Sequence, residues 1–294
     1  MAVDTKKSLR NQVLYSIYVR NYSKEGTFAA VQADLDRIKA LGTDIIWLLP
    51  IHPTGEKNRK GSLGSPYAIR DYRAVNPEFG TLDDFRHLVD AIHARGMKCI
   101  IDVVYNHTSP DSILATGHPE FFLRDEAGNP TRKVADWSDV VDLDYSNREL
   151  WKYQIETLKI WAEIVDGFRC DMAMLVPIEF WNETAQRLRR VKPGLFMLAE
   201  AEQADLFDRA FDACYAWEFH HIVNDIAQGR RRVWDLRNYL YADRDRYPRS
   251  AMRLMFTSNH DENSWNGSEF RRLGDAAGIM AALTFVLPQS MPLV

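Results

Sequence analysis

Short apolar runs rich in β-branched residues alternate with amphipathic stretches along almost all of this chain of 294 residues. The runs predict strands at 13–18, 44–49 and 97–104, four more beginning at Gly167, Leu195, Ala213 and Arg253, and an eighth at 291–294. Seven helices can be placed between them, among them 148–164, 177–190 and 274–286. Regular alternation of this kind is typical of βα units around a parallel sheet.

Eight strands and seven intervening helices predict an α/β fold, a (β/α)8 TIM barrel. The chain stops at Val294, inside the predicted eighth strand, so we expect a barrel that is C-terminally truncated in that strand. A doubly wound open sheet is the alternative, but no Gly-rich phosphate turn follows the first predicted strand.

The connection after the third predicted strand is longer than a simple βα turn requires, and it is rich in Pro and Gly. It predicts a short subdomain inserted over the barrel mouth. The expected organisation is therefore a first part of the barrel at 1–106 (strands 1–3), the insert at 107–147, and a second, incomplete part at 148–294 (strands 4–8).

Composition excludes several classes of function. The formal net charge of −4 comes from intermixed acids and bases, so we expect no nucleic-acid partner and no membrane association. No apolar run reaches the roughly eighteen residues of a membrane span, and we expect a cytoplasmic protein unless a signal was removed. Cys99, Cys170 and Cys214 are widely spaced within apolar runs, which favours buried free thiols. Oligomeric state is not predictable from the sequence.

Polar residues cluster at four predicted strand ends, where the working residues of such barrels lie. The segments are 102–107, 167–171, 197–200 and 256–261. Cleavage of a glycosidic bond needs one carboxylate at the anomeric carbon and one carboxylic acid for the leaving oxygen. Asp171, Glu200 and Asp261 can supply both roles.

The two roles require different ionisation states. Arg169 lies two residues before Asp171 on one strand, so we expect the cation to keep Asp171 ionised as a nucleophile. Burial of Glu200 near other acids should keep it protonated. Each residue also has a structural interpretation: an ion pair for Arg169 and Asp171, an ordinary strand-end acid for Glu200, and a helix cap for 260–261. Their occurrence together favours catalysis.

These segments resemble the α-amylase family of glycoside hydrolases, whose four ordered signatures are similar to 102–107, 167–171, the segment ending in Glu200, and 256–261. Weaker similarities lie at 41–50, at 65–67 with 71–72, and at 142–144. The resemblance extends from Tyr15 to the end of the chain. It implies a retaining enzyme that cleaves α-1,4-glucosidic bonds in starch-like glucans or maltooligosaccharides through a covalent glucosyl-enzyme intermediate.

Carried over by position, the resemblance implies Asp171 as nucleophile, Glu200 as acid/base and Asp261 as the acid that holds the distorted sugar. It implies that four further residues bind substrate: Tyr67, His107, Arg169 and His260. Asn106 and Asp142 match positions that often hold a structural calcium, and no organic cofactor is expected.

Two departures bear on the substrate. Met174 and Leu175 stand where many α-amylases have Lys-His, which puts the leaving-group contacts in question. Gly64-Ser65-Pro66, rather than an acid, precede Tyr67, which favours an endo-acting or oligosaccharide-cutting enzyme over a strict α-glucosidase. The alternatives are a glucanotransferase or cyclodextrin-opening enzyme with the same residues, or, less favoured, a non-catalytic glucan-binding or assembly module.

Overall fold

The strands of the large sheet are all parallel and follow one another around a barrel. The computed structural model describes residues 5 and 7–294. The strands are β1 (Leu14–Ile17), β2 (Ile45–Leu48), β3 (Lys98–Val103), β6 (Gly167–Cys170), β7 (Phe196–Ala199), β8 (Ala213–Tyr215), β9 (Met252–Met255) and β10 (Ser290–Pro292), in the order β1-β2-β3-β6-β7-β8-β9-β10. Leu293 forms a parallel bridge with Leu14, and the Val294 N–H donates to the Leu14 carbonyl at 2.8 Å. The two edges of the sheet therefore meet, and the predicted (β/α)8 barrel is confirmed.

The strands are short apolar runs because both of their faces are covered. Alternate residues, such as Ile45 and Trp47 of β2, contribute to a core inside the barrel, and Ile46 and Leu48 pack against the outer helices. All three cysteines lie on strands, where they are buried and free as predicted.

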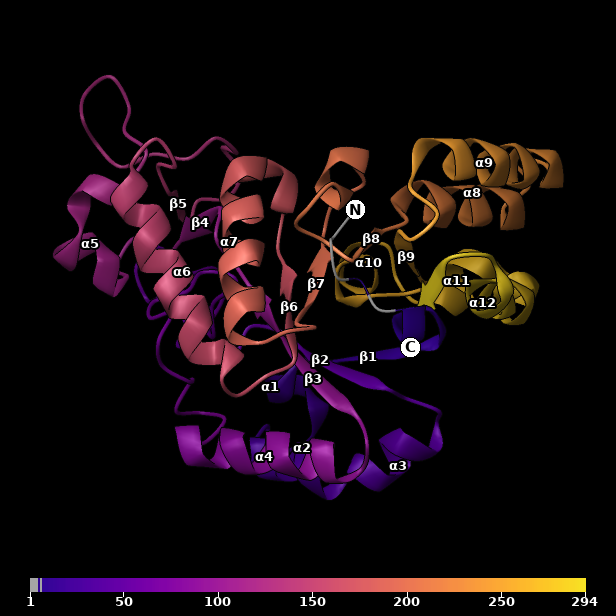
Figure 1. The fold of residues 1–294 in the computed structure, drawn as a ribbon, viewed down its shortest axis with the longest axis horizontal. Helices are drawn as coiled ribbons and strands as arrows, with labels where there is room; N and C mark the ends of the chain where they lie inside the picture. The colour runs from indigo at the N-terminus through magenta and orange to yellow at the C-terminus, as the bar shows by residue number, and fades with distance from the viewer. Residues whose placement is uncertain (1–4, 6) are drawn as a thin grey trace.

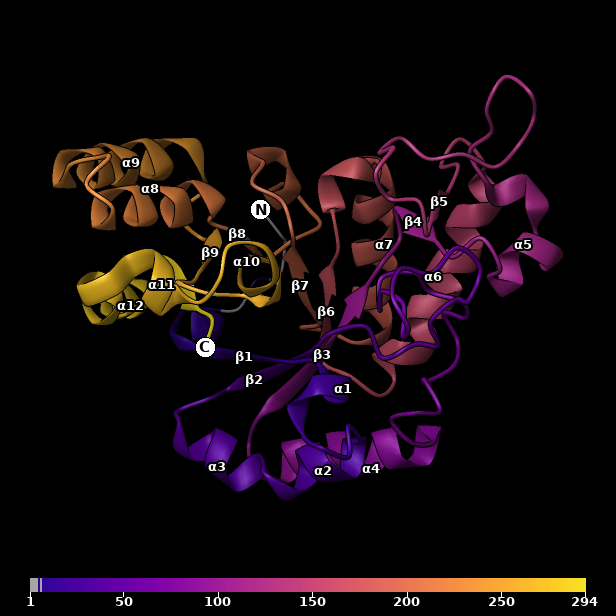
Figure 2. The same cartoon turned by 180° about the vertical axis from the view of Figure 1, so that it is seen from behind.

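Helices surround the barrel in two groups. Helices α2 (Phe28–Ala33), α3 (Leu35–Ala40), α4 (Leu82–Ala94), α6 (Arg148–Ala162) and α7 (Ile178–Val191) cover β1 to β7, and α8 (Trp217–Ala227), α9 (Val233–Arg246), α11 (Glu269–Leu273) and α12 (Ala277–Val286) lie on the other side (Figure 1). Shorter pieces are α1 (Val19–Tyr22), α10 (His260–Trp265) and the 3₁₀ helices η1 (Lys7–Asn11), η3 (Ala173–Leu175), η4 (Ala204–Phe207) and η5 (Gly274–Ala276). The view from behind shows the same two groups (Figure 2).

One expected helix is reduced to a short turn. Between β7 and β8 the described chain forms only η4, and Glu202 at the start of this link accepts from the Glu218 N–H of α8. Elsewhere the helix starts follow local sequence signals. Thr81 caps α4 through the Asp84 N–H, and the Asp84 carboxylate accepts from the Thr81 N–H, a complete capping box.

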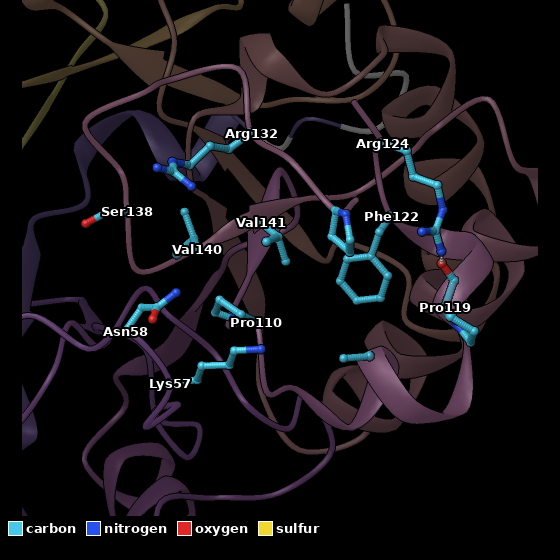
Figure 3. Close-up of a pocket in the computed structure, with 12 residues that line it drawn as sticks. Lys57, Asn58, Pro110, Pro119, Phe122, Arg124, Arg132, Ser138, Val140 and Val141 are labelled. Carbon is cyan, nitrogen blue, oxygen red and sulfur yellow. Dashed lines mark hydrogen bonds between the residues drawn. The ribbon is translucent and has the colours of Figure 1, made fainter. Parts of the chain in front are cut away.

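The connection between β3 and α6 carries a small antiparallel ladder. Its strands are β4 (His107–Thr108) and β5 (Val141–Asp142), with α5 (Ile113–Gly117) and the 3₁₀ helix η2 (Pro119–Phe121) between them. A pocket of about 230 Å³ opens here, lined by Phe122, Val140 and Val141 with Lys57 and Arg132 at its rim (Figure 3). The exact limits of an inserted subdomain at 107–147 stay a prediction.

No helix among the described residues is long and apolar enough to cross a membrane.

Candidate active site

A fully buried arginine, Arg169, organises the carboxyl ends of β3, β6 and β7. Phe168 and Cys170 belong to the outer core, so Arg169 between them points into the barrel. Its register partner on β3 is Asp102. The Nη1 atom lies 2.9 Å from Asp102 Oδ1 and 3.0 Å from Asp171 Oδ1, and Nη2 lies 2.9 Å from Glu200 Oε2. One guanidinium thus gathers three carboxyl groups from three strands.

The glycine that begins β6 permits this arrangement. A Cβ atom on Gly167 would lie 2.2 Å from the carbonyl oxygen of Phe196 on β7, so no side chain fits. The two strands can pair closely only with glycine here, and their pairing aligns Cys170 with Ala199, the residues directly before Asp171 and Glu200.

Glu200 is held from a second direction by the backbone that follows Asp171. Met172 adopts a left-handed conformation, φ 42° and ψ 45°, which is strained for a residue with a side chain. Its N–H donates to Glu200 Oε2 at 2.9 Å. The chain turn after Asp171 therefore fixes the Glu200 carboxyl.

Tyr67 and His260 close the site on the side of β9. The Tyr67 hydroxyl lies 2.7 Å from His260 Nε2 and donates to Asp102 Oδ2 at 3.2 Å, and the two rings stack. His260 and Asp261 begin α10, where Asn259 caps the helix through the Glu262 N–H. Asp261 Oδ2 lies 3.5 Å from His260 Nε2. The Tyr67–His260 pair thus joins the β9 end of the barrel to the Arg169 cluster.

Burial dominates the ionisation of the cluster. It raises the pKa of Asp102 to about 6, that of Asp171 to about 7 and that of Glu200 to about 8, although Arg169 opposes each rise. Burial also raises the pKa of Asp261. Arg169 lowers the pKa of Asp171, which is the effect that the sequence predicts, but burial raises it by more. Glu200 still keeps its proton to higher pH than Asp171.

His260 has the opposite shift. Burial, with Arg169 adding to it, lowers the pKa of His260 to about 3, so the imidazole is neutral. Because the one Tyr67 hydroxyl proton is donated to Asp102, the neutral ring donates from Nε2 to the Tyr67 oxygen, and it adds no second positive charge beside Arg169.

One oxygen of the cluster has no hydrogen-bond partner. Asp171 Oδ1 accepts from Arg169, whereas the buried Oδ2 has no hydrogen-bond partner among the described residues. An oriented carboxylate with one free oxygen, next to a carboxylic acid on the same guanidinium, is a suitable arrangement for nucleophilic attack and proton donation.

Six of the residues predicted for the site lie together: Tyr67, Arg169, Asp171, Glu200, His260 and Asp261. His107 is buried: its Nδ1 lies 3.1 Å from Asn106 Nδ2, its carbonyl accepts from the Tyr72 hydroxyl at 2.8 Å, and its ring packs against Trp137 of the insert. Burial lowers the pKa of His107 to about 4.

The sequence analysis missed three members of the site. Asp102 stood in a recognised segment, but nothing in the sequence reveals that it is the strand neighbour of Arg169. Tyr215, whose hydroxyl accepts from Arg169 Nε at 3.3 Å, follows Ala213 at the two-residue spacing of an inward face, a signal that could have found it. The strained Met172 gives no sequence signal.

The predicted calcium ligands are neighbours, but both oxygens of Asp142 face nitrogen atoms. Asp142 Oδ1 faces Asn106 Nδ2 at 3.5 Å, and Asp142 Oδ2 accepts from the Lys133 N–H at 3.0 Å. Calcium takes six to eight oxygen ligands. No group of three or more His, Cys, Asp or Glu residues that could hold a metal occurs among the described residues. This donor set does not fit calcium, which stays an untested expectation.

A pocket of about 470 Å³ opens between the insert and the segments that follow Asp171 and Glu200. Its lining comes from the insert, including Lys133, from residues 173–178 after Asp171, and from Gln203 and Asp205 after Glu200. Met174 and Leu175, the departures noted in the sequence, form part of its apolar wall. The three candidate acids themselves are not in its lining.

Known proteins are similar to this chain over most of its length. The model of the alpha-amylase catalytic domain matches residues 7–121. The structure of an α-amylase from Lactobacillus plantarum is 46% identical with a TM-score of 0.93, covering 98% of this chain and 72% of that one. A noncanonic maltogenic α-amylase from Thermotoga neapolitana is 39% identical with a TM-score of 0.90, covering 97% and 67%. The fold is that of a glycoside hydrolase barrel.

The chain belongs to the α-amylase family. A more distant member, an α-amylase from Geobacillus thermoleovorans solved in complex with acarbose, is 25% identical with a TM-score of 0.79, covering 98% of this chain and 70% of that one. The curated relatives that the chain matches are named as α-amylase, maltosyltransferase and trehalose synthase/amylase, and the chain spans 28% to 52% of their length.

Proposed function

We propose that this protein cleaves α-1,4-glucosidic bonds in glucans or maltooligosaccharides with retention of configuration. The observation that carries the proposal is the shared guanidinium of Arg169, which holds Asp171 and Glu200 on its two terminal nitrogens while Asp171 Oδ2 stays free. A retaining enzyme needs its two carboxyl groups close together, because the first attacks the sugar directly.

In the first step, Asp171 Oδ2 attacks the anomeric carbon as Glu200 protonates the departing oxygen, which gives a glucosyl-enzyme ester and a free sugar end. In the second step, Glu200 accepts a proton from water, and the water oxygen displaces Asp171. Asp261 and His260 hold the sugar hydroxyls, and Tyr67 lies beneath the ring. The higher pKa of Glu200, about 8 against about 7 for Asp171, gives each carboxyl the protonation that the first step needs.

The leaving sugar occupies the pocket of about 470 Å³ beyond Glu200. Because Glu200 protonates the departing oxygen, it stands on the leaving-group side of the scissile bond. Gln203, Asp205 and Leu206, which line this pocket, follow Glu200 closely in the chain. Met174 and Leu175 form an apolar wall against which a sugar ring can pack.

Transfer to a second sugar is the alternative, since an acceptor hydroxyl can replace water in the second step. Among the relatives are proteins named as maltosyltransferases, which is the reason for retaining transfer as the alternative. The deciding experiment incubates maltooligosaccharides with the protein, with and without a labelled glucose acceptor. Hydrolysis predicts new reducing ends with little label incorporated, whereas transfer predicts labelled oligosaccharides. An intact substrate would contradict both.

A further inference from the structure

A second fully buried arginine lies outside the barrel wall. Met252 and Leu254 of β9 face the core inside the barrel, so Arg253 between them points outward. Its side chain has 0% exposure. Its Nη1 lies 3.2 Å from Asp243 Oδ1 on α9, and its guanidinium stacks 3.9 Å over the Tyr247 ring. A buried cation is costly unless it is paired, so its partners carry information about its role.

The main partner of Arg253 is Glu202, two residues after Glu200. Arg253 Nη2 donates to Glu202 Oε1. Glu202 Oε2 accepts from the Glu218 N–H at the start of α8, at 2.9 Å, and the Glu202 carbonyl accepts from the Tyr247 hydroxyl at 3.0 Å. Three separate atoms of Glu202 are thus fixed, each by a different element of the protein.

Arg253 also reaches the Arg169 cluster by a second route. Its Nη2 donates to the carbonyl of Tyr215 at 3.1 Å, and the Tyr215 hydroxyl accepts from Arg169 Nε at 3.3 Å. The segment after β7 contains only the short helix η4, so it has little regular structure of its own to fix Glu200. The hydrogen bonds from Arg253 to Glu202 and to the Tyr215 carbonyl hold this part of the chain instead.

From these contacts we propose that Arg253 and Glu202 are positioning residues that hold the Glu200 carboxyl at its place in the site. This inference rests on the proposed function of Glu200 as acid/base. The Glu202 carboxylate itself is bound by Arg253 and by the Glu218 N–H rather than by Arg169. Loosening its anchor should move Glu200 off the Met172 N–H, and misplacement by about 1 Å can cost about a hundredfold in rate.

The test compares Arg253→Lys and Glu202→Gln with the matched control Arg189→Lys. Arg189 forms another buried pair, 3.1 Å from Asp212, whose carboxylate holds the Met197 N–H near the opposite end of β7. We measure kcat/KM on a maltooligosaccharide, whose leaving oxygen needs a proton, and on α-maltosyl fluoride, whose fluoride leaves without one.

We expect both variants to lose roughly tenfold to a hundredfold on the maltooligosaccharide and much less on the fluoride, because only the first reaction depends on a well-placed acid. Arg189→Lys should lower both rates by the same factor or not at all. Equal losses on both substrates in Arg253→Lys and Glu202→Gln would overturn the inference and leave a structural role only.

Crystal structures of the two variants decide the question independently of activity. The inference predicts that Glu200 Oε2 leaves the Met172 N–H, and Glu200 unmoved in both variants would overturn it. Should Arg253→Lys fail to fold, the milder Glu202→Gln carries both measurements. A wild-type protein that cleaves neither substrate would refute the proposed function, and the crystallographic comparison would still test the positioning.

Discussion

Arg169 and Arg253 are both completely buried, yet their surroundings differ in a way that separates chemistry from support. Inside the barrel, Arg169 faces three carboxyl groups, and one oxygen of Asp171 stays unpartnered. Outside, Arg253 faces Glu202 and Asp243. Both oxygens of Glu202 accept hydrogen bonds, and Asp243 Oδ1, which accepts none among the described residues, lies 3.2 Å from Arg253 Nη1. Three carboxyl groups around one cation inside the barrel, against two around Arg253, indicate a reactive centre. The anchored carboxylate of Glu202 indicates a scaffold.

The largest effect should come from the free carboxylate. Asp171→Asn removes the nucleophile, and we expect kcat/KM on maltooligosaccharides to fall by about 10⁴-fold or more. Asp243→Asn, which alters an acid beside the outer arginine, should retain most of the activity. Comparable losses of kcat/KM in both variants would contradict the assignment of a catalytic role to the inner cluster and a structural role to the outer one.

Replacement of Glu200 by Gln should have the next largest effect, roughly a hundredfold to ten-thousandfold, because it removes the proton donor but preserves shape. A glycosyl fluoride should still form the ester on Asp171. Azide needs no base, so it should restore turnover in Glu200→Gln and leave Asp171→Asn inactive. A Glu200→Gln variant with near-normal rates would show that the acid had been assigned wrongly.

The pH dependence of kcat/KM tests the ionisation of the acids around Arg169. Asp171 must be ionised, so activity is lost as the pH falls through about 7, and Glu200 must be protonated, so activity is lost as the pH rises through about 8. We expect a narrow bell in kcat/KM between these values. With a glycosyl fluoride, the alkaline limb should vanish in Glu200→Gln and the acidic limb should stay. A profile flat from pH 5 to 9 would be incompatible with both shifts.

The smallest expected effect concerns calcium. Because both oxygens of Asp142 face nitrogen donors, we expect excess EDTA to leave the melting temperature unchanged. Calorimetry before and after calcium is restored measures this. A fall with EDTA that calcium reverses would show that Asn106 and Asp142 rearrange around the ion.

The fold was largely predictable because the strands of a parallel barrel are buried on both faces and stand out as apolar runs. The pairing of Asp102 with Arg169 was not, since register between strands distant in sequence depends on the assembled sheet. The different orientations of Glu200 and Glu202 were likewise not predictable from the sequence. Both are acids at one strand end, and only the packing of β9, α8 and α9 directs the second one outward. The strain at Met172 likewise depends on tertiary structure.

The account rests on Asp171 and Glu200 acting as a close pair on one guanidinium, and the stereochemistry of the first product tests this most directly. NMR of maltooligosaccharide cleavage, recorded before mutarotation, should show the α-anomer released first, because two successive displacements at one carbon retain configuration. Initial release of the β-anomer would mean a single displacement by water and would contradict the assignment of Asp171 as nucleophile.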